Sequence, residues 1–595
     1  MIKEKYIPKL AYLFIILALL ICTSIYLYNK FTPETLVEPD YIQSSFNKDE
    51  IMEINIEIDE DNLTSLIENA LQEQYVPANI TIDGTTINNI GIRAKGNSSL
   101  RRVSSSKQPE RYSFKINFSE YITDQNFLGL EKMVLNNMIG DSTYLKEYLS
   151  YDLMEFLNIN TPAFCFASIS VNGEYWGLYL AVETLEQDFL ERYYGKDYGN
   201  LYKPDTEDGM GGGGKNQMGQ PPEMMQNTKN QIGQPPEVMQ NAENQMGQSP
   251  EMAQNLENQM GQPPQMSRNS QAKVTGLIYV DDEISSYSTI FDSVVTDGLT
   301  DQDKYKYIEM VKALNNGTDL EKYLNVDEIL RYFAVNTFLV NLDSYAGNMK
   351  HNYYLYEENG VFSILPWDFN LSFGTFQMNS SQKVINFPID EPVTDTMENS
   401  PLISKLLEVD EYKNLYHTYL NQIVEEYVNS GIYENKINTL NKLIYDYVAI
   451  DDIAFYTLEE YELGIQNLLI YGEDRAKSIS LQLNGEQPSD DYGNLETTFN
   501  VSALGSLENS EDENKASIKK TNIQSKKENL TQSSNTQQLN SNNQMSNTNR
   551  EMKNNMQKSI NQQNIYAYKN IFIYSIISLI GLVFVLIYKR KKYKT

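Results

Sequence analysis

The chain has 595 residues and a formal net charge of −32, with 80 Asp and Glu against 48 Lys and Arg. This acidic balance argues against nucleic acid as a partner, because phosphate backbones bind to basic surfaces. With only two cysteines and two histidines, a disulfide framework is excluded from the folded part and a zinc site is disfavoured. The length allows two or three domains.

Both ends of the chain carry an uncharged apolar run beside basic residues. Residues 10–28 follow the lysine-containing stretch 1–9, and residues 571–588 precede the basic tail 589–595. Each run is just long enough to span a bilayer, and the positive flanks place both ends in the cytoplasm. We therefore expect a cell-membrane protein anchored through both termini, with its central part outside the cytoplasm. A cleaved signal peptide is the alternative for the first run, although no A-x-A-like site follows it.

After a polar spacer at residues 30–50, residues 51–205 have the pattern of strands and short helices. Alternation of apolar residues and turn dipeptides such as Asp83-Gly84 and Asn172-Gly173 indicate hairpins. The predicted elements are a strand at 54–58, a helix at 59–73, a hairpin at 76–92, a strand at 111–118, a helix at 141–157 and a hairpin at 164–182. This region is predicted to be a β-rich N-lobe.

Residues 206–272 have low complexity, with a unit such as KNQMGQPPEMMQNT repeated in tandem. Because the repeat is short and polar, it cannot bury a hydrophobic core, and we expect a disordered insertion. This insertion is either a tolerated surface segment or a docking or substrate segment. Residues 273–483 are predicted to be a mainly helical C-lobe, with helices at 304–314, 320–324, 326–340, 402–407, 411–429, 432–448 and 457–481. Residues 485–568, rich in Asn, Gln and Ser, are predicted to be a disordered linker.

The stretch 341–374, NLDSYAGNMKHNYYLYEENGVFSILPWDFNLSFG, has the pattern of a functional site. A loop with Asp343, Asn348 and Asn352 precedes two β-prone runs joined by Glu-Asn-Gly, and the second run leads into Asp368. The predicted hairpin brings Asp368 back towards Asp343. Carboxylates and carboxamides that converge in this way can hold Mg²⁺ or Mn²⁺, and their order is that of a protein-kinase catalytic loop followed by its metal loop. Loop Asp and Asn residues also cap turns, which is the structural alternative.

Two further stretches are candidates for phosphate binding. GIRAKGNSSL is a strand that runs into a hydroxyl-rich turn, whose backbone N–H groups could face phosphate oxygens. Lys115 lies inside the strand pattern of RYSFKINF; it either extends into solvent or meets the same phosphates, with Glu147 or Asp152 as its partner. Glu183 follows a predicted strand, where a two-lobed nucleotide enzyme would connect its lobes.

These blocks, together with VNGEYWGLYLAVE, GNLYKPD, DSYAGNMKHNYYLY and LPWDFNLSFG, resemble the spore-coat CotH family of atypical protein kinases over about residues 51–483. The resemblance implies an α+β, two-lobed protein-kinase-like fold. It also implies transfer of the γ-phosphoryl group of ATP to Ser or Thr of a protein substrate, using Mg²⁺ or Mn²⁺, in association with the spore coat or envelope. The acidic chain favours a basic protein substrate.

The resemblance also implies roles for single residues. Asp343 would orient the acceptor hydroxyl, Asp368 would bind the metal, and Lys115 would bind the α- and β-phosphates. The nucleotide-binding turn would comprise Lys95, Gly96, Asn97, Ser98 and Ser99, with Glu183 nearby.

The asparagine that binds the metal has two candidates. Asn348 has the D-x-x-x-x-N spacing of ordinary kinases, whereas Asn352 immediately precedes a strand, and we prefer Asn352 for that reason. The chain departs from kinases in lacking a DFG tripeptide, and it has Asn370 where some members of the family carry a second acidic residue.

Two other functions stay open. A kinase-fold enzyme could transfer another group, such as AMP, because nucleotide orientation decides which phosphorus is attacked. A non-catalytic pseudokinase or surface scaffold would fit the predicted location outside the cytoplasm, where ATP is scarce.

Overall fold

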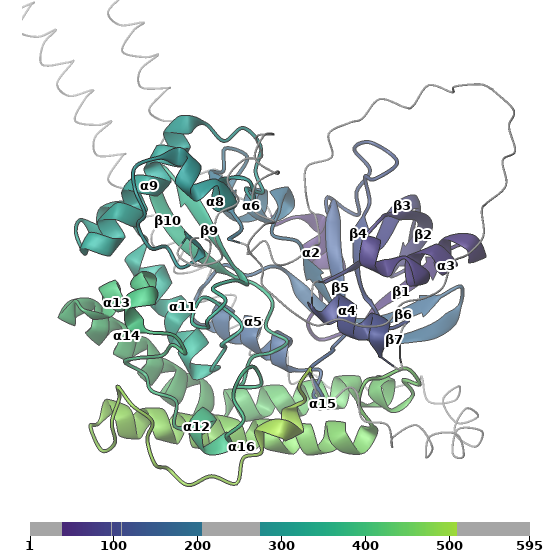
Figure 1. Ribbon diagram of the computed structural model, residues 1–595. Coiled ribbons are helices and arrows are strands. Elements are labelled where there is room, and N and C mark those ends of the chain that lie inside the picture. Colours follow the sequence, from purple (N-terminus) through teal and green to yellow (C-terminus); the bar gives the residue numbers. More distant parts are fainter. Residues whose placement is uncertain (1–37, 97, 107, 109, 205–273, 508–595) are drawn as a thin grey trace, which may run out of the picture. The chain divides into compact units, whose positions relative to one another are not determined.

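The computed structural model describes residues 38–96, 98–106, 108, 110–204 and 274–507, all within one compact unit (Figure 1). The predicted membrane-spanning runs at 10–28 and 571–588 and the repeats lie outside these residues. Within the described part of the chain, no helix combines the length and apolarity needed to cross a bilayer.

Seven strands of the N-terminal half form a closed barrel in the order β1-β2-β3-β4-β5-β7-β6. All neighbours are antiparallel except β1 and β6, whose parallel pairing closes the barrel. The strands are β1 Met52–Glu57, β2 Val76–Ile82, β3 Thr85–Lys95, β4 Ser113–Asn117, β5 Lys132–Asn136, β6 Phe164–Val171 and β7 Glu174–Glu183.

Alternating apolar side chains fill the barrel, among them Ile54, Ile92 and Ile116. Strands β6 and β7 differ from the others because they contain long runs of consecutive buried residues, which lie on both faces of the strand. Their outward side chains, including Phe166 and Leu180, belong to the hydrophobic core of the helical half. One core is therefore enclosed by the barrel and a second core lies between the barrel and the helices.

The helical half confirms the predicted helices, which begin at good capping residues such as Thr300 and Thr457. The helices are α2 Asp40–Ser44, α3 Glu60–Glu68, α4 Ser98–Ser105, α5 Lys146–Phe156, α6 Gln187–Tyr194, α8 Ser288–Phe291, α9 Asp301–Asn316, α10 Leu320–Tyr323, α11 Val326–Phe338, α12 Ser381–Ile385, α13 Pro401–Leu407, α14 Asp410–Gln422, α15 Ile432–Ala449 and α16 Leu458–Leu483. A π-helical turn, Ile423–Val428, extends α14.

A second sheet has three strands in the order β10-β9-β8. Strands β9 (Tyr353–Glu358) and β10 (Val361–Pro366) form the predicted hairpin, with Asn359 and Gly360 at φ values of 55° and 85° in its turn. Both positive φ values suit a tight hairpin and explain the Asn-Gly pair. Strand β8 (Asn200–Tyr202) precedes the repeats and pairs with β9.

The chain that follows the repeats is anchored on the same sheet region. The Tyr353 hydroxyl donates to the backbone oxygen of Thr275 at 2.6 Å, and the Tyr345 hydroxyl donates to that of Gly276 at 3.0 Å. The segments before and after the insertion are thus both held beside the candidate site loop.

The predicted two-lobed, kinase-like fold is wrong, whereas the membrane helices predicted at 10–28 and 571–588 lie outside the residues that the structure describes. The N-terminal strands close into a barrel, and this barrel shares one hydrophobic core with the helices. The physical reason is that β6 and β7 are apolar on both faces, so their outer face must be covered. No described helix supplies a membrane span.

Two boundaries also differ from the prediction. Part of the predicted spacer folds, since Tyr41 of α2 is completely buried. Residues 485–507, the first part of the predicted linker, also belong to the folded part, since Leu504, in a 3-10 turn, is completely buried. The prediction missed β5, β8, α4 and α6, which are short.

A buried ion pair joins the barrel to the helices. The Arg111 guanidinium lies 2.7 Å from the carboxylate of Asp451, just after α15, and neither side chain is exposed. It also donates to the backbone oxygens of Trp176 and Leu178 at 3.2 and 2.8 Å. A Cβ at Gly177 would lie 1.9 Å from Arg111 Nη1, so only glycine leaves room for the guanidinium.

We expect Asp451→Ala to lower the free energy of unfolding by about 3–5 kcal/mol, because it leaves the Arg111 charge buried without its partner. Urea denaturation of the full chain measures this change. Asp452→Ala, at the exposed neighbouring position, is the matched control and should stay within about 0.5 kcal/mol of the wild type. A loss below about 1 kcal/mol for Asp451→Ala would contradict the role of this pair.

Candidate functional site

The structure brings Asp343 and Asp368 together, as the hairpin predicts. Asp343 lies in the loop after α11, and Asp368 directly follows β10. Burial raises the pKa of the Asp368 carboxyl; Lys95 opposes this change and the negative charge of Asp343 adds to it. Asp368 also has a φ of +62°, a conformation that is uncommon outside glycine and needs support from its surroundings.

Asn352 and His351 hold the Asp343 carboxylate. The Asn352 side-chain amide donates to Asp343 Oδ2 at 3.1 Å and to its backbone oxygen at 3.0 Å. His351 Nε2 lies 3.0 Å from Asp343 Oδ1. Asn348 is exposed and its side-chain oxygen accepts a hydrogen bond from Thr394 at 3.2 Å. Of the two asparagine candidates, the geometry favours Asn352, while the role in metal binding stays a prediction.

Lys95, at the end of β3, lies close to Asp368. Its ammonium donates to Asn136 Oδ1 at 2.9 Å, and the Asn136 amide donates to both carboxylate oxygens of Glu147 at 3.1 and 2.9 Å. Lys95 Nζ also lies 5.8 Å from the centroid of the Trp367 ring. Burial lowers the pKa of Lys95, whereas Asp368 and Glu147 raise it. Asn136 therefore bridges the Lys95 ammonium and the Glu147 carboxyl group at the end of β5.

The candidate site contains more carboxyl groups than cationic side chains that contact them. Burial and the nearby charge of Asp368 raise the pKa of Glu147 to about 8, despite the opposing charge of Lys95. Asp343, Asp368 and Asn352 offer only oxygen ligands to a cation, since the Asn352 amide nitrogen is engaged by Asp343. Such a set suits Mg²⁺ or Mn²⁺, which bind one or two carboxylates and complete their shells with water and phosphate. Among the described residues, no cluster of three His, Cys, Asp or Glu forms a metal site.

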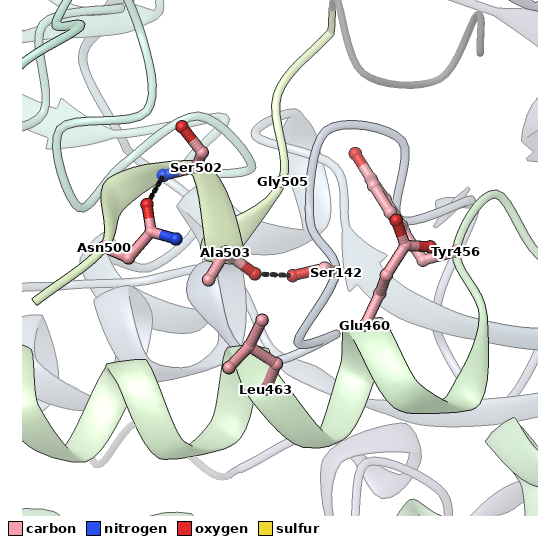
Figure 2. Close-up of a pocket in the computed structure, with 8 residues that line it drawn as sticks. All are labelled: Ser142, Tyr456, Glu460, Leu463, Asn500, Ser502, Ala503 and Gly505. Atoms are coloured by element: carbon pink, nitrogen blue, oxygen red, sulfur yellow. Dashed lines mark hydrogen bonds between the residues drawn. The ribbon is translucent and has the colours of Figure 1, made fainter.

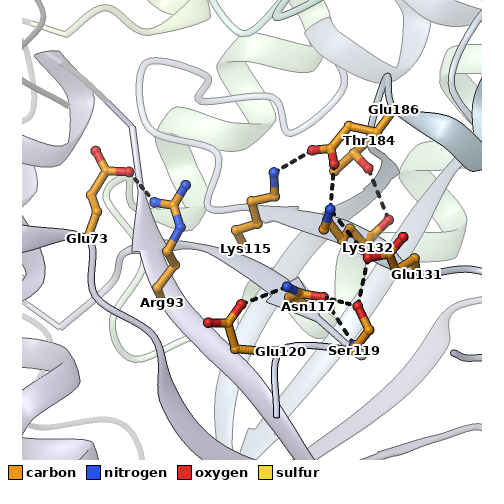
Figure 3. A network of polar contacts seen from close by, with 10 residues as sticks. All are labelled: Glu73, Arg93, Lys115, Asn117, Ser119, Glu120, Glu131, Lys132, Thr184 and Glu186. Atoms are coloured by element: carbon orange, nitrogen blue, oxygen red, sulfur yellow. Dashed lines mark hydrogen bonds and ion pairs between the residues drawn. The ribbon is translucent and has the colours of Figure 1, made fainter. Parts of the chain in front are cut away.

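Lys115 lies in a different network, one strand further along the barrel wall (Figure 3). Its ammonium donates to Glu186 at 2.6 Å, and Lys132 binds the same carboxylate at 2.8 Å. Burial alone would raise the pKa of Glu186, but the positive charges of these two lysines lower it to about 2. The predicted partners of Lys115 are wrong: Glu147 binds Asn136, and Asp152 pairs with Lys436.

Glu183 has a buried structural environment. Its carboxylate accepts hydrogen bonds from Tyr41, from the Ala163 backbone and from Arg192, and the side chain has no exposure. The structure thus gives this carboxylate internal partners and does not bring it to Asp343 and Asp368.

The predicted phosphate turn joins β3 to α4. Gly96 has a φ of +129°, and a Cβ there would lie 2.6 Å from Ser99 Oγ, so the tight approach requires glycine. Ser98 is exposed and begins α4, with Ser99 next to it. Asn97 lies outside the described residues. The turn directly follows Lys95, which places it beside the Asp368 side of the site.

Residues that the sequence reasoning missed lie on α5. Tyr151 accepts a hydrogen bond from the Asp368 backbone N–H at 3.4 Å, and the Ser150 hydroxyl lies 3.1 Å from that of Ser372. Lys146 is completely buried and donates to Thr375. The sequence DSTYLKEYLSYDLMEFL contains a signal for these residues, because polar residues lie on the same side of the helix as leucines. Such polar residues are buried with the leucines and must form hydrogen bonds inside the protein.

A separate cavity of about 140 Å³ lies between α16 and the segment around residue 503 (Figure 2). It is lined by Ser142, Tyr456, Glu460, Leu463, Asn500, Ser502, Ala503 and Gly505. None of these residues belongs to the Asp343–Asp368 site. The volume is also below the roughly 300 Å³ at which ligand pockets begin, so this cavity is not the candidate active site.

We expect Asn352→Ala to weaken Mn²⁺ binding by about 10-fold or more, because the variant loses a ligand oxygen and frees the Asp343 carboxylate. Isothermal titration calorimetry of the full chain with Mn²⁺ and an ATP analogue measures the effect. Asn348→Ala, which changes an exposed side chain, is the control and should bind as the wild type does. The reverse order would transfer the metal role to Asn348.

Two comparisons relate this chain to known proteins. Residues 92–479 match the family of CotH kinase proteins. Over 193 residues the chain is 21% identical to the inner spore coat protein H of Bacillus subtilis (strain 168). The aligned region covers 31% of this chain and 50% of that protein. The chain therefore aligns with about half the length of this relative. The family match takes in more than half of the chain, with Lys95, Asp343 and Asp368 inside it, and the chain thus belongs to the CotH kinase protein family.

Proposed function

We propose that this protein is an ATP-dependent protein kinase that phosphorylates Ser or Thr side chains of a protein substrate. The observation that carries the proposal is the convergence of Asp343, Asn352, Asp368 and Lys95 from three separate stretches of the chain. Membership of the CotH kinase protein family supports it. The name of the Bacillus subtilis relative supports a setting in the spore coat.

In this reaction Asp343 acts on the acceptor. His351 and Asn352 each contact one of its carboxylate oxygens, which fixes the carboxylate in one orientation. Asp343 then orients the acceptor hydroxyl and takes its proton as the oxygen attacks the γ-phosphorus. The bond from the γ-phosphorus to the bridging oxygen breaks, and ADP leaves with that oxygen.

The other residues bind the phosphates. Asp368 and Asn352 would hold Mg²⁺ or Mn²⁺, which when bound neutralises phosphate charge. Lys95 supplies a cation beside Asp368, oriented by Asn136. Gly96, Ser98 and Ser99 follow Lys95 closely in the chain, and their backbone N–H groups would bind phosphate oxygens. Phosphoryl transfer needs mainly such positioning and charge stabilisation, with little covalent help from the protein.

The lysine assignments give a direct comparison. Lys95 is close enough to Asp368 to lower the pKa of its carboxyl, whereas Lys115 is bound to Glu186. We therefore expect Lys95→Met to reduce kcat/KM for ATP by about 100-fold, and Lys115→Met to reduce it by about 10-fold or less. Initial rates at varied ATP concentrations measure both. A larger loss for Lys115→Met would restore the role that the family resemblance implies for it.

The proposal itself is tested with the full chain, Mn²⁺ or Mg²⁺, a generic basic protein and ATP labelled at the γ-phosphate. We expect label transfer that falls by at least about 100-fold in Asp343→Asn and Asp368→Asn. Both variants keep the shape of the residue and remove its charge.

A parallel reaction with ATP labelled at the α-phosphate separates the alternatives. Transfer of the α-label alone would overturn the kinase proposal in favour of AMP transfer. Metal-dependent ATP binding without transfer of either label to any protein in the mixture would favour a pseudokinase, and no ATP binding would favour a scaffold.

A further inference from the structure

The segment that begins at Asp368 is attached to α5 at successive points. The Asp368 N–H donates to the Tyr151 hydroxyl at 3.4 Å, and the Ser372 and Ser150 hydroxyls lie 3.1 Å apart. At the end of the segment, the Lys146 ammonium donates to Thr375 Oγ1 at 2.8 Å. The Lys146 contact is the strongest of these by distance and charge, since hydrogen bonds from ionised donors exceed those between neutral groups.

Lys146 also holds the chain on the barrel side. Its ammonium donates to the backbone oxygen of Gly140 at 2.6 Å, in the loop that follows β5. In the same loop, the backbone oxygen of Ile139 accepts a hydrogen bond from the Asn370 side chain at 3.1 Å. One buried ammonium therefore links α5, the loop after β5 and the end of the Asp368 segment.

Burial makes this ammonium costly. Lys146 has no exposed surface, and burial lowers its pKa to about 8, while Asp141 acts in the opposite direction. Asp141 itself is occupied by the backbone N–H groups of Thr143 and Lys146 and by the Thr143 hydroxyl. An apolar residue would fill the same space at lower cost, so the contacts of the ammonium need an explanation beyond packing.

The position of Asp368 supplies that explanation. Asp368 has a positive φ, a backbone conformation that persists only where the surroundings impose it. The loop after β5 connects directly to Asn136, which orients Lys95. Lys146 thus couples the loop that follows Asn136, the residue that orients Lys95, to the segment that carries Asp368.

We propose that Lys146 is a positioning residue for phosphoryl transfer, which fixes the Asp368 segment through Thr375 and Gly140. The proposal rests on the proposed function for its catalytic consequence. Its consequence for the orientation of Asp368, and hence for metal affinity, stands without that function. Lys146 touches neither substrate nor phosphate in this role.

The test uses the full chain and compares Lys146→Met, Thr375→Val and Thr375→Ser. Thr375 is half-buried, so its variants should fold, and Ser keeps the hydroxyl that accepts from Lys146. We expect Lys146→Met and Thr375→Val each to weaken Mn²⁺ binding by about 10-fold and to lower kcat with little change in KM for ATP. Thr375→Ser should stay within about 2-fold of the wild type.

The double variant Lys146→Met, Thr375→Val should lose no more than the worse single variant, because both substitutions break the same contact. Additive losses would overturn the proposal, as would wild-type Mn²⁺ affinity and kcat in folded Thr375→Val. If Lys146→Met does not fold, the Mn²⁺ affinity and kcat of Thr375→Val, compared with those of Thr375→Ser, decide whether Lys146 positions the Asp368 segment.

The two proposals fail in different ways. If the wild type transfers no phosphoryl group, the proposed function fails, and calorimetric Mn²⁺ affinity alone still decides the role of Lys146. If the wild type is an active kinase and the valine variant matches it in both readouts, only the role of Lys146 fails.

Discussion

The burial of α5 is the constraint on which the rest of the structure depends. The helix lies between the outer wall of the barrel and the helical half, and eight of its residues from Lys146 to Met154 are buried. Several of these are polar, and each buried polar group must find a partner inside the protein. The hydrogen-bond partners are Asn136 for Glu147, Ser372 for Ser150 and the Asp368 backbone for Tyr151. The packing of one helix thereby sets where the barrel meets the candidate site.

Electrostatics then decide what that site can bind. Asp343, Asp368 and Glu147 gather around few cations, and burial raises the pKa values of the last two. A divalent cation with bound phosphates would relieve this imbalance, because its charge stabilises the ionised carboxylates. Lys95 lies close to Asp368 and Glu147 and donates a hydrogen bond to Asn136. These charges support the proposed ligand, a metal ion with bound phosphates.

The sequence predicts most local structure here because its signals are local. Turn residues define the β9–β10 hairpin, and this hairpin is what brings Asp368 to Asp343. The barrel was not predictable in this way, since its closing pair joins β1 to β6, strands more than 100 residues apart along the chain. The lysine assignment depends on cross-strand register: Lys115 lies opposite Arg93 and Lys95 opposite Ser113. Spacing along the chain does not reveal which of two such lysines meets a loop from the other half.

The anchoring of the chain on both sides of the repeats has a consequence for how this protein can change over generations. Strand β8 is hydrogen-bonded to β9, and the Tyr353 and Tyr345 hydroxyls hold residues 275 and 276. Both attachment points are fixed by the folded part, whatever lies between them. Repeat units can therefore be gained or lost between these two attachment points while the folded part keeps its geometry.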